Sequence, residues 1–140
     1  MTKGKRMARI VVAGCGHWGK NLIRNFHACG HLYGICDNNP DTLAEFSARY
    51  PGIRTFQQFG QVLADEEVDA VALATPAELH YAMAMEAMDA GKDVFVEKPL
   101  ALNAADGREM VQKARSAGLM LMVGHLLRYH PAVLKMREMI

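Results

Sequence analysis

The feature that most constrains this chain is a glycine-rich segment that follows an apolar run near the N-terminus. Residues 8–13 (ARIVVA) have the character of a buried strand, and Gly14-Cys15-Gly16-His17-Trp18-Gly19 then supplies the spacing G-x-G-x-x-G ahead of a helical pattern. In a βαβ unit the first glycine permits a tight turn, the second lets a pyrophosphate approach the backbone, and the third lets the helix pack close to the sheet. The free N–H groups and positive dipole end of that helix bind the diphosphate. The segment therefore predicts a dinucleotide-binding loop, with a purely structural glycine-rich turn as the alternative.

An acidic residue in the expected place supports the dinucleotide interpretation. Asp37 follows a second apolar run that ends at Ile35-Cys36, 23 residues after Gly14. A carboxylate there suits hydrogen bonds to the adenine-ribose hydroxyls. Asn38 and Asn39 follow it, and no basic residue stands close enough to clamp a 2′-phosphate. The sequence favours NAD, with NADP as the alternative.

The rest of the chain alternates between strand and helix patterns. We expect strands at about 8–13, 32–36, 54–55, 70–74, 94–96 and 119–123, and helices at about 17–28, 40–50, 57–65, 78–90, 103–117 and 131–140. In the fourth helix Leu79, Met83, Ala87 and Ala90 form one apolar stripe. Such alternation is typical of a parallel sheet covered on both faces. The prediction is an α/β fold, a Rossmann-like doubly wound parallel sheet in a three-layer αβα sandwich.

Composition excludes several classes of function. The chain has 140 residues, 51% of them hydrophobic, and a net charge of +1, which gives no reason to expect nucleic-acid or anionic-membrane partners. The basic tail Thr2–Arg6 is expected to be a solvated terminus. No apolar run reaches the roughly 18 residues of a transmembrane helix, and the N-terminus lacks the apolar region of a signal peptide. Cytoplasmic localisation is therefore expected.

The cysteines and histidines do not form a metal-binding pattern. Three cysteines occur without a C-x-x-C pair, so we expect reduced, structural thiols at Cys15, Cys29 and Cys36. His125 and His130 are five residues apart, and no third ligand stands at a suitable spacing. We expect no metal, and these two histidines either line a pocket or pack ordinarily.

A second chemical motif follows the fifth expected strand. Val94-Phe95-Val96 runs directly into Glu97-Lys98-Pro99. Because ligands of open α/β sheets bind at the carboxyl ends of the strands, we expect Glu97 and Lys98 near the nicotinamide. Partial desolvation beside a cationic ring would favour a neutral lysine that exchanges a proton with a substrate hydroxyl. Pro99 fixes the turn, and a cis bond before it would aim Lys98 inward. The alternative is an ordinary surface Glu-Lys pair before a turn proline.

Taken together, these motifs resemble the Gfo/Idh/MocA oxidoreductases. The matching features, in order, are the glycine fingerprint, Thr75-Pro76, His80, Gly91-Lys92-Asp93-Val94-Phe95-Val96-Glu97-Lys98-Pro99, and Gly124 with Arg128 and Pro131. The resemblance extends from Arg9 to Ile140. The stretch from Leu121 to Pro131 is most similar to members that act on nucleotide-linked amino sugars.

The resemblance implies a role for each residue of these motifs. Residues implied at the pyrophosphate are Gly14, Gly16, His17, Trp18 and Gly19. Asp37 would hold the adenine ribose, and Thr75, Pro76 and His80 would border the cofactor. Glu97 would contact the nicotinamide ribose, and Arg128 would approach the nicotinamide end. Lys98 would be catalytic and would touch both the substrate and the nicotinamide ribose.

The resemblance also implies a second domain. Residues 1–130 would form the NAD(P)-binding domain, and residues 131–140 would begin the connection to a C-terminal substrate domain that this chain lacks. In the family that domain supplies most of the substrate pocket and usually the interface of a homo-oligomer. We therefore expect an NAD-dependent oxidoreductase acting on a sugar or nucleotide sugar, inactive as 140 residues alone. The alternative is a stand-alone NAD-binding or regulatory module without catalysis.

Overall fold

The fold is built on one parallel sheet with the strand order β3-β2-β1-β4-β5-β6. A computed structural model describes residues 7–140, so the basic tail before Met7 lies outside the described residues. The strands are β1 (Ile10–Ala13), β2 (Leu32–Cys36), β3 (Arg54–Phe56), β4 (Ala70–Leu73), β5 (Asp93–Val96) and β6 (Leu121–Val123). The order reverses between β1 and β4, as in a doubly wound dinucleotide-binding fold. The predicted fold class is confirmed.

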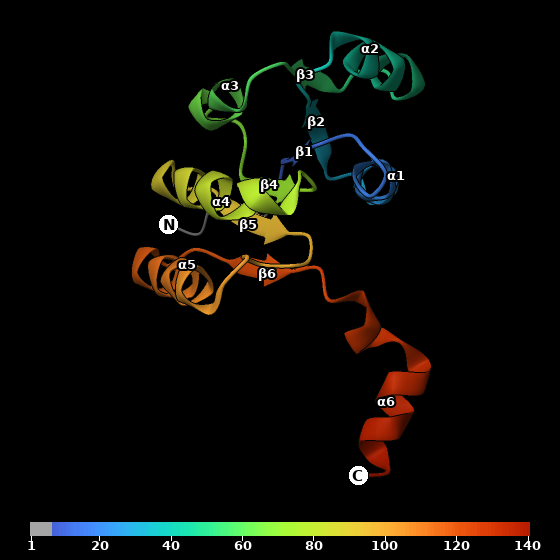
Figure 1. Ribbon diagram of the computed structural model, residues 1–140. Helices are drawn as coiled ribbons and strands as arrows, with labels where there is room; N and C mark the ends of the chain where they lie inside the picture. Colours follow the sequence, from blue (N-terminus) through green and yellow to red (C-terminus); the bar gives the residue numbers. More distant parts are fainter. Residues whose placement is uncertain (1–6) are drawn as a thin grey trace.

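Helices cover both faces of this sheet (Figure 1). The elements are α1 (Gly19–Ala28), α2 (Pro40–Arg49), α3 (Phe59–Ala64), α4 (His80–Asp89), α5 (Ala104–Ala117) and α6 (Pro131–Glu138), with short 3₁₀ turns η1 (Ala77–Leu79) and η2 (Leu126–Tyr129). Figure 1 shows α3, α4 and α5 on one face and α1 and α2 on the other. A core cluster with Val62, Met88 and Met110 lies under the first group, and one with Ile23 and Phe46 lies under the second.

Local sequence signals account for several helix boundaries. The Asn39 side chain accepts a hydrogen bond of 2.9 Å from the Asp41 N–H at the start of α2, where Pro40 is the first helical residue. Asn103 caps α5 by accepting from the Asp106 N–H at 2.9 Å. Gly118 ends α5 with φ at 67°, a left-handed conformation that favours glycine.

The buried face of α4 differs from the apolar stripe expected there. Leu79 is 47% exposed and Ala90 is exposed, whereas the residues buried along this helix are His80, Ala84, Ala87 and Met88. Leu79 belongs to the 3₁₀ turn η1 and Ala90 follows the last residue of α4, so of the expected stripe only Met83 and Ala87 lie in this helix, and Ala87 is buried as expected. Three strands are also shorter than expected, because residues 8–9, 74 and 119–120 lie outside β1, β4 and β6.

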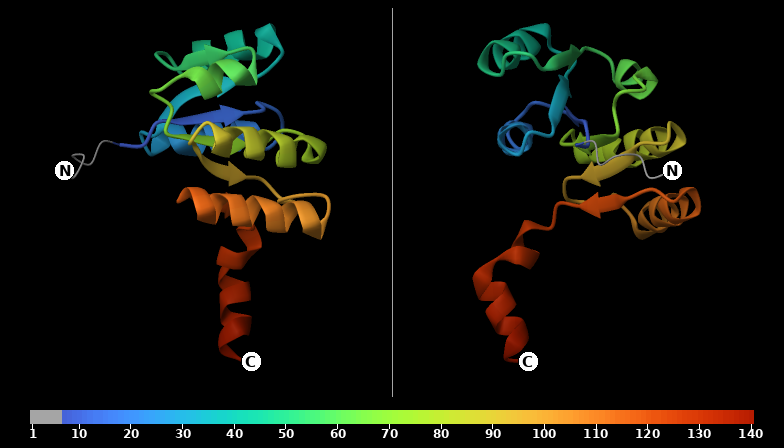
Figure 2. Two further views of the ribbon diagram at one scale, coloured as in Figure 1. Left: turned by 90° about the vertical axis from the view of Figure 1, so that its left-hand side faces the viewer. Right: turned by 180° about the vertical axis from the view of Figure 1, so that it is seen from behind.

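The last helix stands away from the sheet. Figure 2 shows α6 extending below the domain in both views, after the turn η2. Exposed apolar side chains cluster on this part of the chain, at Leu126, Leu127, Tyr129, Met136 and Met139. No helix among residues 7–140 is long and apolar enough to cross a bilayer.

Candidate functional site

The candidate site is organised by a row of backbone hydrogen bonds at the carboxyl edge of the sheet. One residue follows each of the strands β1, β2, β4, β5 and β6 directly. These residues occupy equivalent positions, because the last residues of the five strands pair with one another across the sheet. All five N–H groups of this row donate to the neighbouring strand: Gly14 to Cys36 O (2.8 Å), Asp37 to Phe56 O (3.1 Å), Ala74 to Ala13 O (2.8 Å), Glu97 to Leu73 O (2.9 Å) and Gly124 to Val96 O (2.8 Å). The glycine loop and the Glu97-Lys98-Pro99 segment therefore lie on the same edge.

The three fingerprint glycines are needed for different steric reasons. Gly14 has φ at +90°, and a Cβ there would lie 2.8 Å from the Ala74 backbone. A Cβ on Gly19 would lie 1.8 Å from the carbonyl oxygen of Gly14. A Cβ on Gly16 would meet no atom within 4 Å, because this residue faces open space. Gly14 and Gly19 therefore hold the loop against the sheet and helix, and Gly16 keeps space free in front of the loop.

The loop offers hydrogen-bond donors to an anion. Within the described part of the chain, the backbone N–H groups of Gly16, His17 and Trp18 donate no hydrogen bond. They precede the first turn of α1, where the helix dipole favours negative charge. Unused donors, a positive helix end and the space at Gly16 together fit the pyrophosphate of a dinucleotide.

The carboxylate of Asp37 fastens the glycine loop to the end of β2. Its Oδ2 accepts a hydrogen bond of 2.9 Å from the Cys15 N–H, and its Oδ1 accepts one of 2.9 Å from the Asn39 N–H. Each carboxylate oxygen can accept more than one hydrogen bond, so capacity for ribose hydroxyls remains. Asp37 thus has a structural role that sequence reasoning did not assign.

A cavity of about 670 Å³ lies in front of the glycine loop. Of the residues predicted to bind the cofactor, its lining contains Gly14, Gly16, His17, Trp18, Asp37, Thr75 and Pro76. Gly19 is buried behind the loop. The lining also contains residues that sequence reasoning missed, among them Asn38, Gln57, Phe59, Leu79 and Met83. Gln57 and Phe59 follow β3, and this position after a parallel strand is the sequence feature that could have placed them at the site. Leu79 and Met83 lie in the stripe expected on α4.

A second, smaller cavity of about 360 Å³ adjoins Lys98. Its lining comes from the segment after β5 and the segment after β6: Lys98, Gly124, His125, Leu126, Leu127 and Arg128. The Lys98–Pro99 peptide bond is cis, one of the two isomers open to a bond before proline. The Lys98 side chain is exposed, so this chain alone does not provide the desolvation expected for it. Lys98 and Arg128 therefore share one hollow.

Glu97 is held beside Gly124. A Cβ on Gly124 would lie 2.9 Å from Oε2 of Glu97 and 3.1 Å from its Oε1. The carboxylate occupies the space that a side chain at 124 would need. Gly124 therefore leaves room for the Glu97 carboxylate, so Glu97, after β5, lies against the segment after β6.

His80 lies beneath the site and not in it. Its side chain is 1% exposed and belongs to the lining of neither cavity. Nδ1 lies 2.7 Å from the carbonyl oxygen of Pro99, and Nε2 lies 2.8 Å from that of Thr75. The resemblance implied that His80 borders the cofactor. In the structure Thr75, whose carbonyl His80 contacts, lines the larger cavity, and His80 lies behind it.

The two cysteines near the glycine loop are free, buried thiols. Burial, followed by the negative charge of Asp37, raises the pKa of Cys15 to about 12. The same two causes raise the pKa of Cys36 to about 11. Thiolate is the reactive form, so both side chains are inert near neutral pH. Cys29 is free and exposed.

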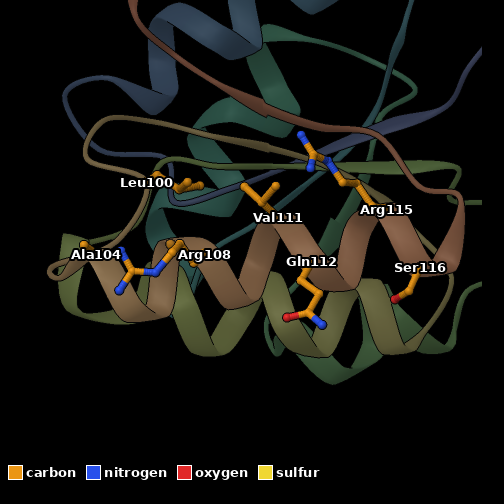
Figure 3. A pocket seen from close by; sticks show the side chains of 8 residues that line it. Leu100, Ala104, Arg108, Val111, Gln112, Arg115 and Ser116 are labelled. Carbon is orange, nitrogen blue, oxygen red and sulfur yellow. The ribbon is translucent and has the colours of Figure 1, made fainter.

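The remaining candidate groups have other positions. His125 lines the smaller cavity, and His130 caps α6 by accepting from the Ala132 N–H at 3.2 Å. Among residues 7–140, no group of three or more His, Cys, Asp or Glu side chains could hold a metal ion. A larger hollow of about 870 Å³ runs along α5, where Figure 3 shows Arg108, Val111 and Arg115 among its lining. It contains none of the residues singled out by the motifs.

Comparison with known proteins agrees with this geometry. Residues 8–125 match the Gfo/Idh/MocA oxidoreductase family, described as having an NAD-binding Rossmann fold. UDP-N-acetylglucosamine 3-dehydrogenase of Acidithiobacillus ferrooxidans is 35% identical over 130 residues, which are 93% of this chain and 41% of that enzyme. D-xylose 1-dehydrogenase (NADP(+)) of Hypocrea jecorina is 37% identical over 99 residues, 69% of this chain and 25% of that enzyme.

Solved structures give the same result. The WlbA dehydrogenase of Bordetella pertussis, in complex with NADH and UDP-GlcNAcA, superposes with a TM-score of 0.87 at 35% identity, covering 95% of this chain and 42% of that one. The chain thus spans about two fifths of the length of these two dehydrogenases, from Acidithiobacillus and Bordetella. The fold, the glycine loop and the family match together show that the chain belongs to the Gfo/Idh/MocA family of NAD-binding oxidoreductases.

Proposed function

We propose that the chain is the cofactor-binding part of an NAD-dependent oxidoreductase that transfers a hydride between nicotinamide and a hydroxyl-bearing carbon of a sugar or nucleotide sugar. The observation that carries this proposal is the hydrogen-bonded row from Gly14 to Gly124, which aligns a diphosphate-binding loop with Lys98 along one sheet edge. A dinucleotide extended along that edge reaches both cavities. NAD, when bound, supplies the hydride acceptor.

The glycine loop and Asp37 hold the adenosine diphosphate half. The donors of Gly16, His17 and Trp18 bind the pyrophosphate, with Gly14 and Gly19 shaping the loop. Asp37 accepts from the adenine-ribose hydroxyls while it anchors the Cys15 N–H. Thr75 and Pro76 border the middle of the cofactor, and the apolar side chains of the larger cavity suit the flat face of an adenine ring.

The segments after β5 and β6 act at the nicotinamide end. Glu97 accepts from the nicotinamide ribose, and Arg128 approaches the same end. Lys98 contacts the substrate hydroxyl, and its Nζ exchanges the proton that accompanies hydride transfer. A bound cofactor and sugar would remove water from the exposed Lys98 amine, which this chain alone leaves solvated.

The substrate class is supported by the relatives. One is named for UDP-N-acetylglucosamine, and the WlbA structure contains UDP-GlcNAcA. We propose that residues 131–140 begin the connection to a domain that binds such a substrate. The exposed apolar residues of η2 and α6, which include Leu127 and Met136, suit burial against that domain.

The test compares this chain with a longer protein in which a substrate domain follows Ile140. We expect the 140-residue chain to bind NADH weakly and to give no turnover with any sugar. Hydride transfer needs the substrate within about 3–3.5 Å of the nicotinamide carbon, and orientation supplies about 7–11 kcal/mol of the barrier. Steady NADH formation by the short chain would contradict the need for a second domain. NADH binding without turnover in the longer protein, over a panel of nucleotide sugars, would favour the regulatory module.

The role of the lysine is tested in the longer protein. Lys98→Ala should lower kcat by a much larger factor than it weakens NADH binding, because the glycine loop and Asp37 hold the cofactor. Lys113→Ala is the matched control, because Lys113 lies on α5 and pairs with Asp89 away from the sheet edge. A fully active Lys98→Ala enzyme would refute the role of Lys98.

A further inference from the structure

His80 is the one fully buried histidine among residues 7–140, and both of its ring nitrogens are engaged. The side chain is 1% exposed, with Nδ1 2.7 Å from Pro99 O and Nε2 2.8 Å from Thr75 O. The two acceptors belong to different loops. Thr75 lines the larger cavity, and Pro99 directly follows Lys98 of the smaller cavity. The imidazole therefore spans from one half of the site to the other.

The His80 ring contacts the two loops just beyond the end of the β4–β5 ladder. The ladder between β4 and β5 ends where the Glu97 N–H donates to Leu73 O at 2.9 Å. Beyond this pair the two strands continue as loops. The His80 ring then joins these loops below the site, at the residues where the ladder can no longer hold them.

The chemistry of the acceptors explains why the residue is a histidine. A carbonyl oxygen only accepts, and a ring N–H can donate to it. The imidazole places one ring nitrogen within hydrogen-bond distance of each carbonyl. A glutamine or asparagine side chain carries its donors on a single nitrogen, so it cannot place a nitrogen at each of the two carbonyls. A phenyl ring would fill the space but would leave two buried carbonyls without partners.

We propose that His80 is a positioning residue that sets the Lys98 loop against the cofactor cavity by holding the Thr75 and Pro99 carbonyls at once. The proposal rests on the proposed oxidoreductase function, because the geometry matters only if Lys98 acts beside a cofactor. A misplacement of about 1 Å at a reacting group can cost about 100-fold in rate. Loss of His80 therefore lowers turnover through Lys98, while the glycine loop and Asp37 continue to hold NADH.

The structural half of the proposal is tested without turnover. Backbone ¹⁵N spectra and relaxation of the 140-residue chain are compared for wild type, His80→Phe and His80→Gln. We expect the Thr75 and Lys98 amides to shift and to gain fast motion in both variants. His31→Gln is the control, because His31 is only half-buried and contacts a single carbonyl, that of Ala8, at 3.0 Å. Wild-type shifts and order at both loops in His80→Phe would overturn the proposal.

The functional half is tested in the longer protein that carries the substrate domain. Rates are expressed per NADH-binding site, titrated through Trp18, the single tryptophan of the chain. This normalisation removes any loss of folded protein, so a role in folding alone would leave kcat unchanged. We expect both His80 variants to lose about 100-fold in kcat, with the Kd for NADH changed less than about threefold. Wild-type kcat in either variant would refute the two-sided link. A fully active Lys98→Ala enzyme would refute the role of Lys98, and a longer wild-type protein that binds NADH without turnover would refute the proposed function. The amide shifts depend on neither result.

Discussion

Gly16 and Gly19 belong to the same motif, yet substitutions at the two positions should have opposite effects. Gly16→Ala places a methyl group where no atom lies within 4 Å, and the φ of Gly16 is not positive. We expect the free energy of unfolding to stay the same or to rise by about 0.4–1 kcal/mol, because alanine restricts the unfolded chain. NADH binding should weaken, because the methyl group occupies the space of the pyrophosphate.

The size of that weakening follows from the donors of the loop. A hydrogen bond to a charged group contributes about 1.5–3 kcal/mol, so displacement of the pyrophosphate from one donor raises the Kd for NADH by about 10- to 150-fold. Gly16→Val should abolish measurable binding. Trp18 fluorescence and calorimetry measure the affinity, and thermal unfolding measures the stability.

Gly19→Ala is the control for this prediction. Its Cβ would lie 1.8 Å from a backbone oxygen of Gly14, and we expect a loss of about 1–3 kcal/mol in stability with or without cofactor. Wild-type NADH affinity in Gly16→Ala would refute the assignment of the phosphate loop. If Gly16→Ala lost as much free energy of unfolding as Gly19→Ala, the steric argument would be refuted.

Four further predictions concern cofactor choice, Glu97 and the thiols. The Asp37 carboxylate should disfavour the 2′-phosphate of NADPH by about 1–3 kcal/mol, because both groups are negatively charged. NADPH should therefore bind about 5- to 150-fold more weakly than NADH. Tighter binding of NADPH in calorimetry would contradict this prediction. Gly124→Ala should move the flexible Glu97 carboxylate and weaken NADH binding while the melting temperature stays nearly unchanged; a large drop in that temperature would show that Glu97 cannot yield. Iodoacetamide at pH 8 should label Cys29 and spare Cys15. Because the folded state raises the pKa of Cys15 from 9.0 to about 12, its contribution to stability is full below pH 9.0 and is lost as the pH rises toward about 12, which pH-dependent unfolding measures.

The sequence predicted the fold well because strand and helix patterns alternate strictly along the chain. Gly14, Asp37 and Glu97 each follow an apolar run, and the carboxyl ends of parallel strands share one edge, so their common location could be expected before any coordinates. The cap at Asn103 and the end at Gly118 also follow from residue type. These features depend on local chemistry, which a sequence displays.

Features that depend on spatial neighbours could not be predicted in the same way. Leu79 lies in a 3₁₀ turn and Met83 lies on α4, and both line the cavity, which apolar spacing along the chain does not distinguish from packing in the core. Phe59 enters the cavity because β3 lies beside β2, which is a matter of strand order. The paired contacts of the His80 ring depend on two loops that are distant in sequence.

The hydrogen-bonded row at the sheet edge ties binding competence to global folding. Its bonds are main-chain bonds that continue the ladders holding the strands of the sheet together, β2 included, so the row cannot loosen while the sheet remains intact. During denaturation the domain should lose its capacity for NADH in the same cooperative transition as its β-sheet signal. The turn η2 and helix α6 lie beyond the last bond of the row, at Gly124. They can open locally, at low cost, while the cofactor edge persists.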